Sequence, residues 1–346
     1  MPAPTSAGNE KPGTVNVALS GGLEMSPDKL RQVAEEVGSE FTAGELQATN
    51  KMVVLALYTL VGDKCCGALV NAGSMLARWF KGDDLEEPLT EFLDMVGADC
   101  EVDEKDGVVI VRNCPECAGY PRLNGPACNF IRGFIAGVVK EVTGEPVKVV
   151  QTECEGAGDG RCVFVIGDES KGGNGEPHIP ELRDFTESEF EEMLSASRDP
   201  EEVAAFKIAS ESLLREVFGD AARPMFFRAG RLYAEAFIDA FDPEDPEELV
   251  ARVEEISGSS YELEGDRFRV EKCLECAGME SDEPVCHAVR GALSMLLEHY
   301  GIPFKRVVEV ECSATKDAVV GSCEVRIEGI AWKVKKVADA VRRAFR

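Results

Sequence analysis

Long apolar runs are missing from the 346-residue sequence, which nowhere approaches the roughly 18 to 20 apolar residues of a membrane-spanning helix. The first residues also lack a basic segment followed by an apolar core, so they do not resemble a secretory signal. We therefore expect a cytoplasmic protein with no membrane span and with a flexible leader over residues 1–25.

Basic residues are the minority among the charged side chains, with 37 Lys and Arg against 64 Asp and Glu, and the formal net charge is -27. Such an acidic surface repels phosphate backbones and anionic lipids, so we expect no nucleic-acid partner. Hydrophobic residues make up 44% of the chain, as in globular proteins. The composition thus predicts an acidic globular protein.

Recognisable catalytic patterns are also missing. There is no nucleophile elbow, no Walker loop and no dinucleotide-binding glycine pattern between a strand and a helix. The histidines His178, His287 and His299 do not recur at equivalent positions, and acidic clusters such as residues 242–248 are typical of solvated helix faces. No general acid–base pair follows from these residues, so enzymatic activity is left open and no catalytic residue is predicted.

Cysteine is abundant, and ten of the 13 cysteines recur in two sets with the same order. In a cytosolic chain this odd number favours metal ligation over disulfides. Each set begins with Cys-x-x-Cys. The third cysteine follows the first after 14 or 13 positions, the fourth follows the third after 26 in both sets, and the fifth follows the fourth after 8 or 11. The sets are Cys114, Cys117, Cys128, Cys154 and Cys162, and then Cys273, Cys276, Cys286, Cys312 and Cys323.

The repeat extends beyond the cysteines. Gly62-Asp63 and Ala72-Gly73 correspond to Gly219-Asp220 and Ala229-Gly230, with an offset of 157 in both cases. Internal similarity of this kind indicates two related domains. Residues 168–180 have the composition of a linker, so we predict a first domain at 26–167 and a second at 181–346.

Both halves have the same predicted order of helices and strands. Ser26-Pro27 is a good helix start, and residues 44–78 are expected to be helical with a break near Gly62. Hairpins are expected at 100–112 and 261–270, each leading into a Cys-x-x-Cys. A helix should follow the third cysteine, and strands should follow at 147–153 with 162–166 and at 307–311 with 323–327. Each half is therefore predicted to be an α+β unit.

The recurring cysteines have the chemistry of a metal site. Cys-x-x-Cys at the end of a hairpin brings two thiolates to one tetrahedral ion, and the fourth and fifth cysteines are able to close the shell. The third cysteine begins a helix, whose N-terminus should favour its thiolate. Zinc is the first choice, and an iron–sulfur cluster is the alternative because it also takes four thiolates. Cys65, Cys66 and Cys100 have no counterparts and are expected to be core residues.

The residues around these cysteines resemble the 4-vinyl reductase (4VR) domain. The similarity covers about residues 45–167 and 200–330. The same module occurs in predicted hydrocarbon-binding proteins of archaea and in the sensor domains of phenol-responsive transcription activators. The matching segments are Pro126-Ala-Cys128, Arg132-Gly133 and Val149 to Phe164, and then Pro284-Val-Cys286, Arg290-Gly291, Glu309 to Cys312 and Gly321-Ser-Cys323.

The resemblance implies a set of zinc ligands, because the phenol sensors hold a structural zinc through three cysteines and one glutamate. Gln151 stands where the first half should have the glutamate and is a poor ligand, so Cys114 or Cys117 is expected to complete the first site. The implied ligands are Cys128, Cys154 and Cys162 in the first half, and Cys286, Glu309, Cys312 and Cys323 in the second.

The resemblance also implies a fold and a function. The fold is an antiparallel sheet covered by helices, which typically dimerises and encloses an apolar cavity; two fused copies would form an intrachain pseudo-dimer, and further homo-oligomers are left open. The leading hypothesis is a metal-binding domain pair that binds or senses a small hydrophobic molecule. The alternatives are an accessory factor or reductase in tetrapyrrole metabolism, and an iron–sulfur or metal carrier.

Overall fold

The computed structural model describes residues 25–120, 123–167, 179, 181–195, 198–243, 246–315 and 319–330. The expected leader lies outside the described residues except for Met25, and the expected linker lies outside them except for Ile179. The domain boundaries therefore stay predictions. No helix in the described part of the chain is long and apolar enough to cross a membrane.

The first half has helices and strands in the predicted order. A short 3-10 helix, η1 (Glu155–Ala157), connects its last two strands. The elements are α1 (Pro27–Glu40), α2 (Ala43–Val61), α3 (Lys64–Leu76), α4 (Glu86–Met95), β1 (Asp99–Asp103), β2 (Val108–Arg112), α5 (Asn129–Thr143), β3 (Val149–Glu153) and β4 (Cys162–Ile166).

The second half repeats this order element by element. Short 3-10 helices lie at η3 (Leu182–Asp184), η4 (Gly219–Ala221) and η5 (Ser313–Thr315). The elements are α6 (Glu187–Leu194), α7 (Pro200–Phe218), α8 (Ala222–Phe241), α9 (Pro246–Ser257), β5 (Ser260–Glu264), β6 (Arg267–Glu271), α10 (His287–His299), β7 (Arg306–Glu311) and β8 (Cys323–Glu328).

The helix boundaries follow local sequence signals. The Ser26 hydroxyl accepts a hydrogen bond from the Lys29 amide at 3.2 Å, as expected for a helix that starts at Ser-Pro. Thr42 and Glu45 form a reciprocal capping box at the start of α2. The expected break near Gly62 is confirmed, because this glycine ends α2 with a φ of 58°.

Each half contains a four-stranded antiparallel sheet, in the orders β1-β2-β4-β3 and β5-β6-β8-β7. The hairpins confirm the Asp106-Gly107 turn signal, since β1 and β2 pair from Asp103 with Val108 upward. Beyond the hairpin, β2 pairs with β4 so that Val111 lies opposite Cys162, and Val270 lies opposite Cys323 in the second sheet. The predicted α+β fold with two repeated units is confirmed.

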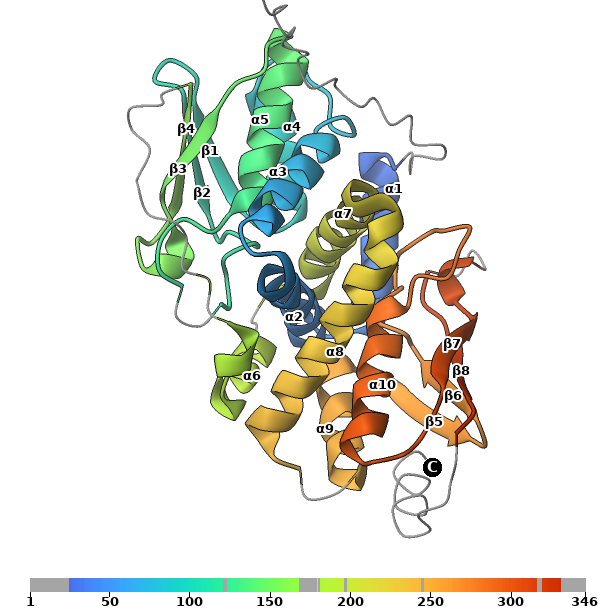
Figure 1. Ribbon diagram of the computed structural model, residues 1–346. Helices are drawn as coiled ribbons and strands as arrows, with labels where there is room; N and C mark the ends of the chain where they lie inside the picture. The colour runs from blue at the N-terminus through green and yellow to red at the C-terminus, as the bar shows by residue number, and fades with distance from the viewer. Residues whose placement is uncertain are drawn as a thin grey trace, which may run out of the picture.

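The helices lie between the two sheets, which occupy opposite sides of the molecule (Figure 1). Contacts between the halves are reciprocal: α1 packs on α7 while α6 packs on α2, and α2 packs on α8 while α7 packs on α3. The equivalent helices α2 and α7 also contact each other in the centre. Each half therefore contributes the same helices to a shared core.

Within each half, one helix pair crosses at unusually short range. A Cβ on Gly73 of α3 would lie 2.0 Å from the Phe130 carbonyl oxygen, and one on Gly133 of α5 would lie 2.1 Å from that of Val70. The equivalent Gly230 and Gly291 are in the same situation on α8 and α10. These repeated glycines allow the backbones to touch, and they set the start of α5 and of α10 against the rest of each half.

Candidate metal centres and apolar pocket

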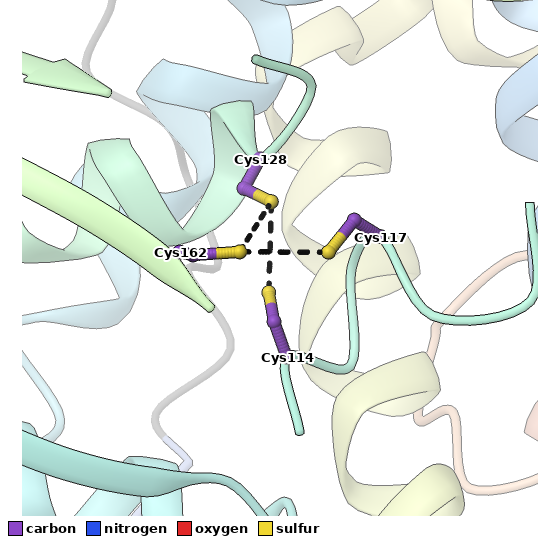
Figure 2. Close-up of side chains that lie close together, drawn as sticks. All are labelled: Cys114, Cys117, Cys128 and Cys162. Atoms are coloured by element: carbon purple, nitrogen blue, oxygen red, sulfur yellow. Dashed lines mark hydrogen bonds between the residues drawn. The ribbon is translucent and has the colours of Figure 1, made fainter. Parts of the chain in front are cut away.

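The first cysteine cluster forms where the end of β2 meets the start of β4. Asn113, with a φ of 54°, turns the chain out of β2 into the Cys-x-x-Cys loop. Cys128 is the N-cap residue of α5, and Cys162 opens β4. Figure 2 shows the four sulfurs of Cys114, Cys117, Cys128 and Cys162 pointing toward one another.

The spacing of these sulfurs is that of ligands around one ion. The Sγ–Sγ distances are 3.6 Å between Cys114 and Cys128, 3.5 Å between Cys117 and Cys162, and 3.7 Å between Cys128 and Cys162. Zn–S bonds of about 2.3 Å in a tetrahedron place the sulfurs about 3.8 Å apart. The four side chains are 0 to 1% exposed. This tetrad is positioned to hold a metal ion.

The second half has the equivalent tetrad, formed by Cys273, Cys276, Cys286 and Cys323. Its Sγ–Sγ distances are 3.5 Å between Cys273 and Cys286, and 3.2 Å from Cys323 to both Cys276 and Cys286. Lys272 has a φ of 52° at the place of Asn113, so the chain leaves β6 by the same turn. The repeat in sequence is thus a repeat of one four-cysteine geometry.

The crowded thiols share their protons unequally. Hydrogen bonds from Cys117 and Cys128 hold the pKa of the Cys114 thiol well below its ordinary value. Burial raises the pKa of Cys128, although we expected the start of α5 to favour its thiolate. Desolvation and the neighbouring sulfurs outweigh the helix terminus at this position.

The fourth cysteine of each set lies beside its tetrad and is not one of its four members. The sulfur of Cys154 is 4.0 Å from that of Cys128, and the sulfur of Cys312 is 3.5 Å from that of Cys286. Both side chains are buried. The tetrads therefore include the Cys-x-x-Cys pairs, whereas the ligand set implied by the family resemblance includes Cys154 and Cys312 instead.

Glu309 and Gln151 occupy equivalent places behind the third cysteine. The Glu309 carboxylate accepts a hydrogen bond from the Cys286 amide at 3.0 Å, and the Gln151 side-chain carbonyl accepts one from the Cys128 amide at 2.9 Å. Glu309 also forms a third possible ligand group with Cys286 and Cys312. Burial raises the pKa of Glu309 to about 7. Both side chains thus position the third cysteine whether or not either one binds the ion.

The glutamate inside each Cys-x-x-Cys was missed by the sequence analysis. The Glu116 carboxylate accepts hydrogen bonds from the Phe130 and Ile131 amides at 2.8 and 2.9 Å. Glu275 does the same for the Ala288 and Val289 amides. Each carboxylate fixes the metal loop to the start of the helix that carries the third cysteine. The available signal was the repeated Glu before the second cysteine.

Buried cations hold these loops from the other side. Lys51 on α2 donates to the carbonyls of Pro115 and Glu116 and lies 4.1 Å from the centre of the Tyr120 ring. Burial lowers the pKa of Lys51 to about 8. In the second half Arg215 binds Glu275 at 2.8 Å. Neither cation belongs to a recognisable sequence motif, so only the fold assigns them this role.

The three cysteines without counterparts lie apart from the tetrads. Cys65 and Cys66 are in α3 and Cys100 is in β1, and none of them joins a ligand group among the described residues. Burial raises the pKa of the Cys65 thiol well above its ordinary range. This placement agrees with the core role expected for Cys65, while Cys66 and Cys100 are half-buried.

An apolar pocket of about 100 Å³ adjoins the second metal loop. Leu274 and Glu275, which lie between Cys273 and Cys276, form one part of its lining. Helices α8, α9 and α10 and strands β5 and β6 form most of the remainder, with Phe237 among the lining residues. Met52 and Val53 of α2 line it from the first half. The pocket therefore depends on the metal loop and on the contact between the halves.

Two α+β halves, each with a buried cysteine tetrad, define a duplicated metal-site protein. The 4-vinyl reductase (4VR) domain family matches residues 108–168 and 266–329, so one match falls in each half. The matches run from the second strand of each hairpin to the end of each sheet and include all five cysteines of each set. The chain is therefore a tandem 4VR domain protein, as the resemblance predicted.

Similar proteins extend this result without naming an activity. Uncharacterized protein MJ0150 of Methanocaldococcus jannaschii is 29% identical over 101 residues, which is 28% of this chain and 58% of that protein. Uncharacterized protein MJ1642 of the same organism is 31% identical over 65 residues, which is 19% of this chain and 40% of that protein. The chain thus spans about half the length of the curated relatives it matches.

Among solved structures, the chain is similar to the crystal structure of the phenol-responsive sensory domain of the transcription activator PoxR with phenol. The sequence identity is 14%, and the match covers 50% of this chain and 83% of that one. The TM-score is 0.20, so this match carries no conclusion about the function of the present chain.

Proposed function

We propose that the protein binds a small hydrophobic ligand in the pocket of its second half, with one structural zinc ion in each half. The observation that carries the proposal is the pocket itself, which is apolar and is built directly on the second metal loop. Pockets of this kind, with an apolar lining and few polar groups, are the usual sites for small ligands.

The polar groups around the pocket already have partners within the protein. The Tyr261 hydroxyl is 2.8 Å from that of Ser257, and Ser259 donates to the Lys272 carbonyl at 2.7 Å. Glu275 is occupied by Arg215 and by two backbone amides. A ligand therefore meets mainly hydrocarbon surface, and an uncharged apolar molecule is the class that fits.

Zinc fits the tetrads better than a cluster does. Four sulfurs only 3.2 to 3.7 Å apart surround a single ion, whereas a cluster holds its thiolates farther apart because several irons lie between them. Complete burial and an all-cysteine shell are typical of structural zinc sites. Bound zinc would keep the metal loop in place and, through Leu274 and Glu275, the wall of the pocket.

The reciprocal helix contacts suggest how a ligand signal is transmitted. The two halves pack as an intrachain pseudo-dimer, in which α2 of the first half covers the pocket of the second. Ligand in the pocket therefore contacts both halves at once. A binding event would bias the packing between them, which is the physical requirement for a sensor.

A metal carrier is the second candidate, and the fourth cysteine of each set favours it. Cys154 and Cys312 each place a buried thiol at 4.0 Å or less from a tetrad sulfur. Such a thiol is able to replace a ligand during metal exchange. Burial of all ten cysteines opposes rapid exchange with solvent, so the structural role is preferred.

Metal analysis should find two zinc ions per chain in protein purified without oxygen. Each tetrad provides one tetrahedral all-thiolate site, and zinc has no visible absorption because its d shell is full. The measurement is elemental analysis by mass spectrometry together with a visible spectrum. A coloured protein that contains iron and sulfide would contradict the zinc assignment and favour a cluster.

Toluene, as a probe of the pocket, should bind to the zinc-loaded protein and bind much more weakly after removal of the metal. The metal loop supplies Leu274 and Glu275 to the pocket, so its release disrupts the lining. Isothermal titration calorimetry measures both states, with circular dichroism as the control for folding. Failure of toluene and of naphthalene to bind the intact protein would disprove the ligand-binding proposal.

A further inference from the structure

We infer that only the second half takes a ligand, because three phenylalanines fill the equivalent place in the first half. This inference rests on the proposed function and assigns the specificity of its site. The residues that open the pocket are Thr49, Ala288 and Ala292, and those that fill its counterpart are Phe206, Phe130 and Phe134.

The equivalence of these positions follows from the repeat. Ala288 and Ala292 lie two and six residues after Cys286, as Phe130 and Phe134 lie two and six residues after Cys128. Both pairs are in the helix that begins at the third cysteine, α10 or α5. Thr49 on α2 and Phe206 on α7 are separated by the same 157 positions as the repeated glycines. Each of these two residues faces the other half.

The first half is filled by aromatic rings at these places. Phe134 packs edge-on against Phe80 and Phe92, with ring centres 5.8 and 4.7 Å apart. Phe130 packs edge-on against Phe206, which reaches across from α7, at 5.6 Å. Phe130 and Phe134 are fully buried, and Phe206 is 5% exposed. The rings occupy the space between helices and sheet that a ligand would need.

The second half has small side chains at the same three places. Thr49, Ala288 and Ala292 all line the pocket, and so does Phe237, the counterpart of Phe80. The ring that would pack on Phe237 is missing, because Ala292 stands where Phe134 does. Loss of ring volume without replacement leaves a cavity in a packed interior.

The missing rings also indicate the size of the ligand. The pocket has about 100 Å³, and an apolar cavity of about 150 Å³ in another protein is known to hold benzene. Glu275, the charged residue of the lining, is already paired with Arg215. The geometry therefore favours one compact, uncharged hydrocarbon or single-ring molecule per chain. Its position is that of the Phe134 ring in the first half.

Toluene titration of matched variants tests this assignment. The wild-type chain should bind one toluene, and Ala292→Phe should weaken binding by about tenfold or more because the new ring occupies the pocket. Ala292→Leu fills less space and provides a second test if the phenylalanine variant does not fold. Phe134→Leu is the matched control in the first half, and it should bind one toluene with the wild-type affinity. Zinc content and thermal unfolding are measured for each variant.

The outcomes separate this inference from the proposed function. Binding of two toluene molecules to the wild-type chain would overturn the inference, and so would loss of binding in Phe134→Leu with retention in both Ala292 variants. In either case the chain would still be a ligand-binding protein. If the wild-type chain binds no apolar probe, the proposed function itself fails.

Discussion

Replacing Cys117 by serine is expected to remove the metal from the first half and to unfold that half. Cys117 contributes one of four thiolates, and its sulfur lies 3.5 Å from that of Cys162. Structural zinc contributes about 10 to 16 kcal/mol of apparent binding free energy in small domains, which is as large as the whole stability of a typical domain. Metal content should fall from two ions per chain to one, and Cys276→Ser should do the same in the second half.

The matched control is Cys154→Ser, which changes an equally buried cysteine of the same set. Cys154 lies beside the tetrad, so this variant should retain two ions and unfold at nearly the same denaturant concentration as the wild type. Cys66→Ser, at a half-buried position in α3, controls for the loss of a thiol elsewhere. Loss of zinc in Cys154→Ser with retention in Cys117→Ser would show that the family ligand set holds the ion instead of the tetrad.

Lys207→Met is expected to destabilise the contact between the halves by about 3 to 5 kcal/mol, because it leaves the charge of Glu211 buried without its partner. The Lys207 ammonium lies 3.2 Å from the Glu211 carboxylate, and the two side chains are 0 and 1% exposed. Asn50 of α2 donates to the same carboxylate at 3.3 Å, so the cluster joins α2 to α7. Equilibrium unfolding in urea measures the effect.

The double variant Lys207→Met with Glu211→Leu should recover most of this loss. Removal of both charges leaves an apolar contact of similar volume, and such replacements of buried ion pairs are often neutral or stabilising. Lys29→Met, which removes an exposed ion pair with Glu280 at 2.7 Å, is the control and should change stability by less than about 1 kcal/mol. A double variant as unstable as the single one would contradict the charge-burial explanation.

Much of the fold could be predicted because local residues decide it. Ser26-Pro27 starts a helix, Gly62 ends one and Asp106-Gly107 turns a hairpin, and each of these signals acts through the backbone conformation of a few neighbours. The two cysteine sets then showed that the whole arrangement occurs twice. A repeat is visible in one dimension, so no knowledge of the tertiary structure was needed to find it.

The membership of the metal site could not be predicted in the same way. Spacing alone offered five cysteines per half, and the family resemblance selected Cys154 and Cys312. The pairing of β2 with β4 instead places the Cys-x-x-Cys loop next to Cys162, and the turn after β3 leaves Cys154 at the side. Which sulfurs meet depends on strand order, and strand order is a long-range property.

The duplicated cysteine sets, the α+β order and the acidic composition were determined by the sequence itself, since each is a local or counted property of the chain. The tetrads, the loop contacts of Lys51 and Glu116, and the pocket were decided only by the tertiary structure. Residues distant in sequence, such as Thr49 and Ala292, form one cavity because α2 crosses into the second half. Packing between the halves, which no local pattern encodes, therefore determines where a ligand is able to bind.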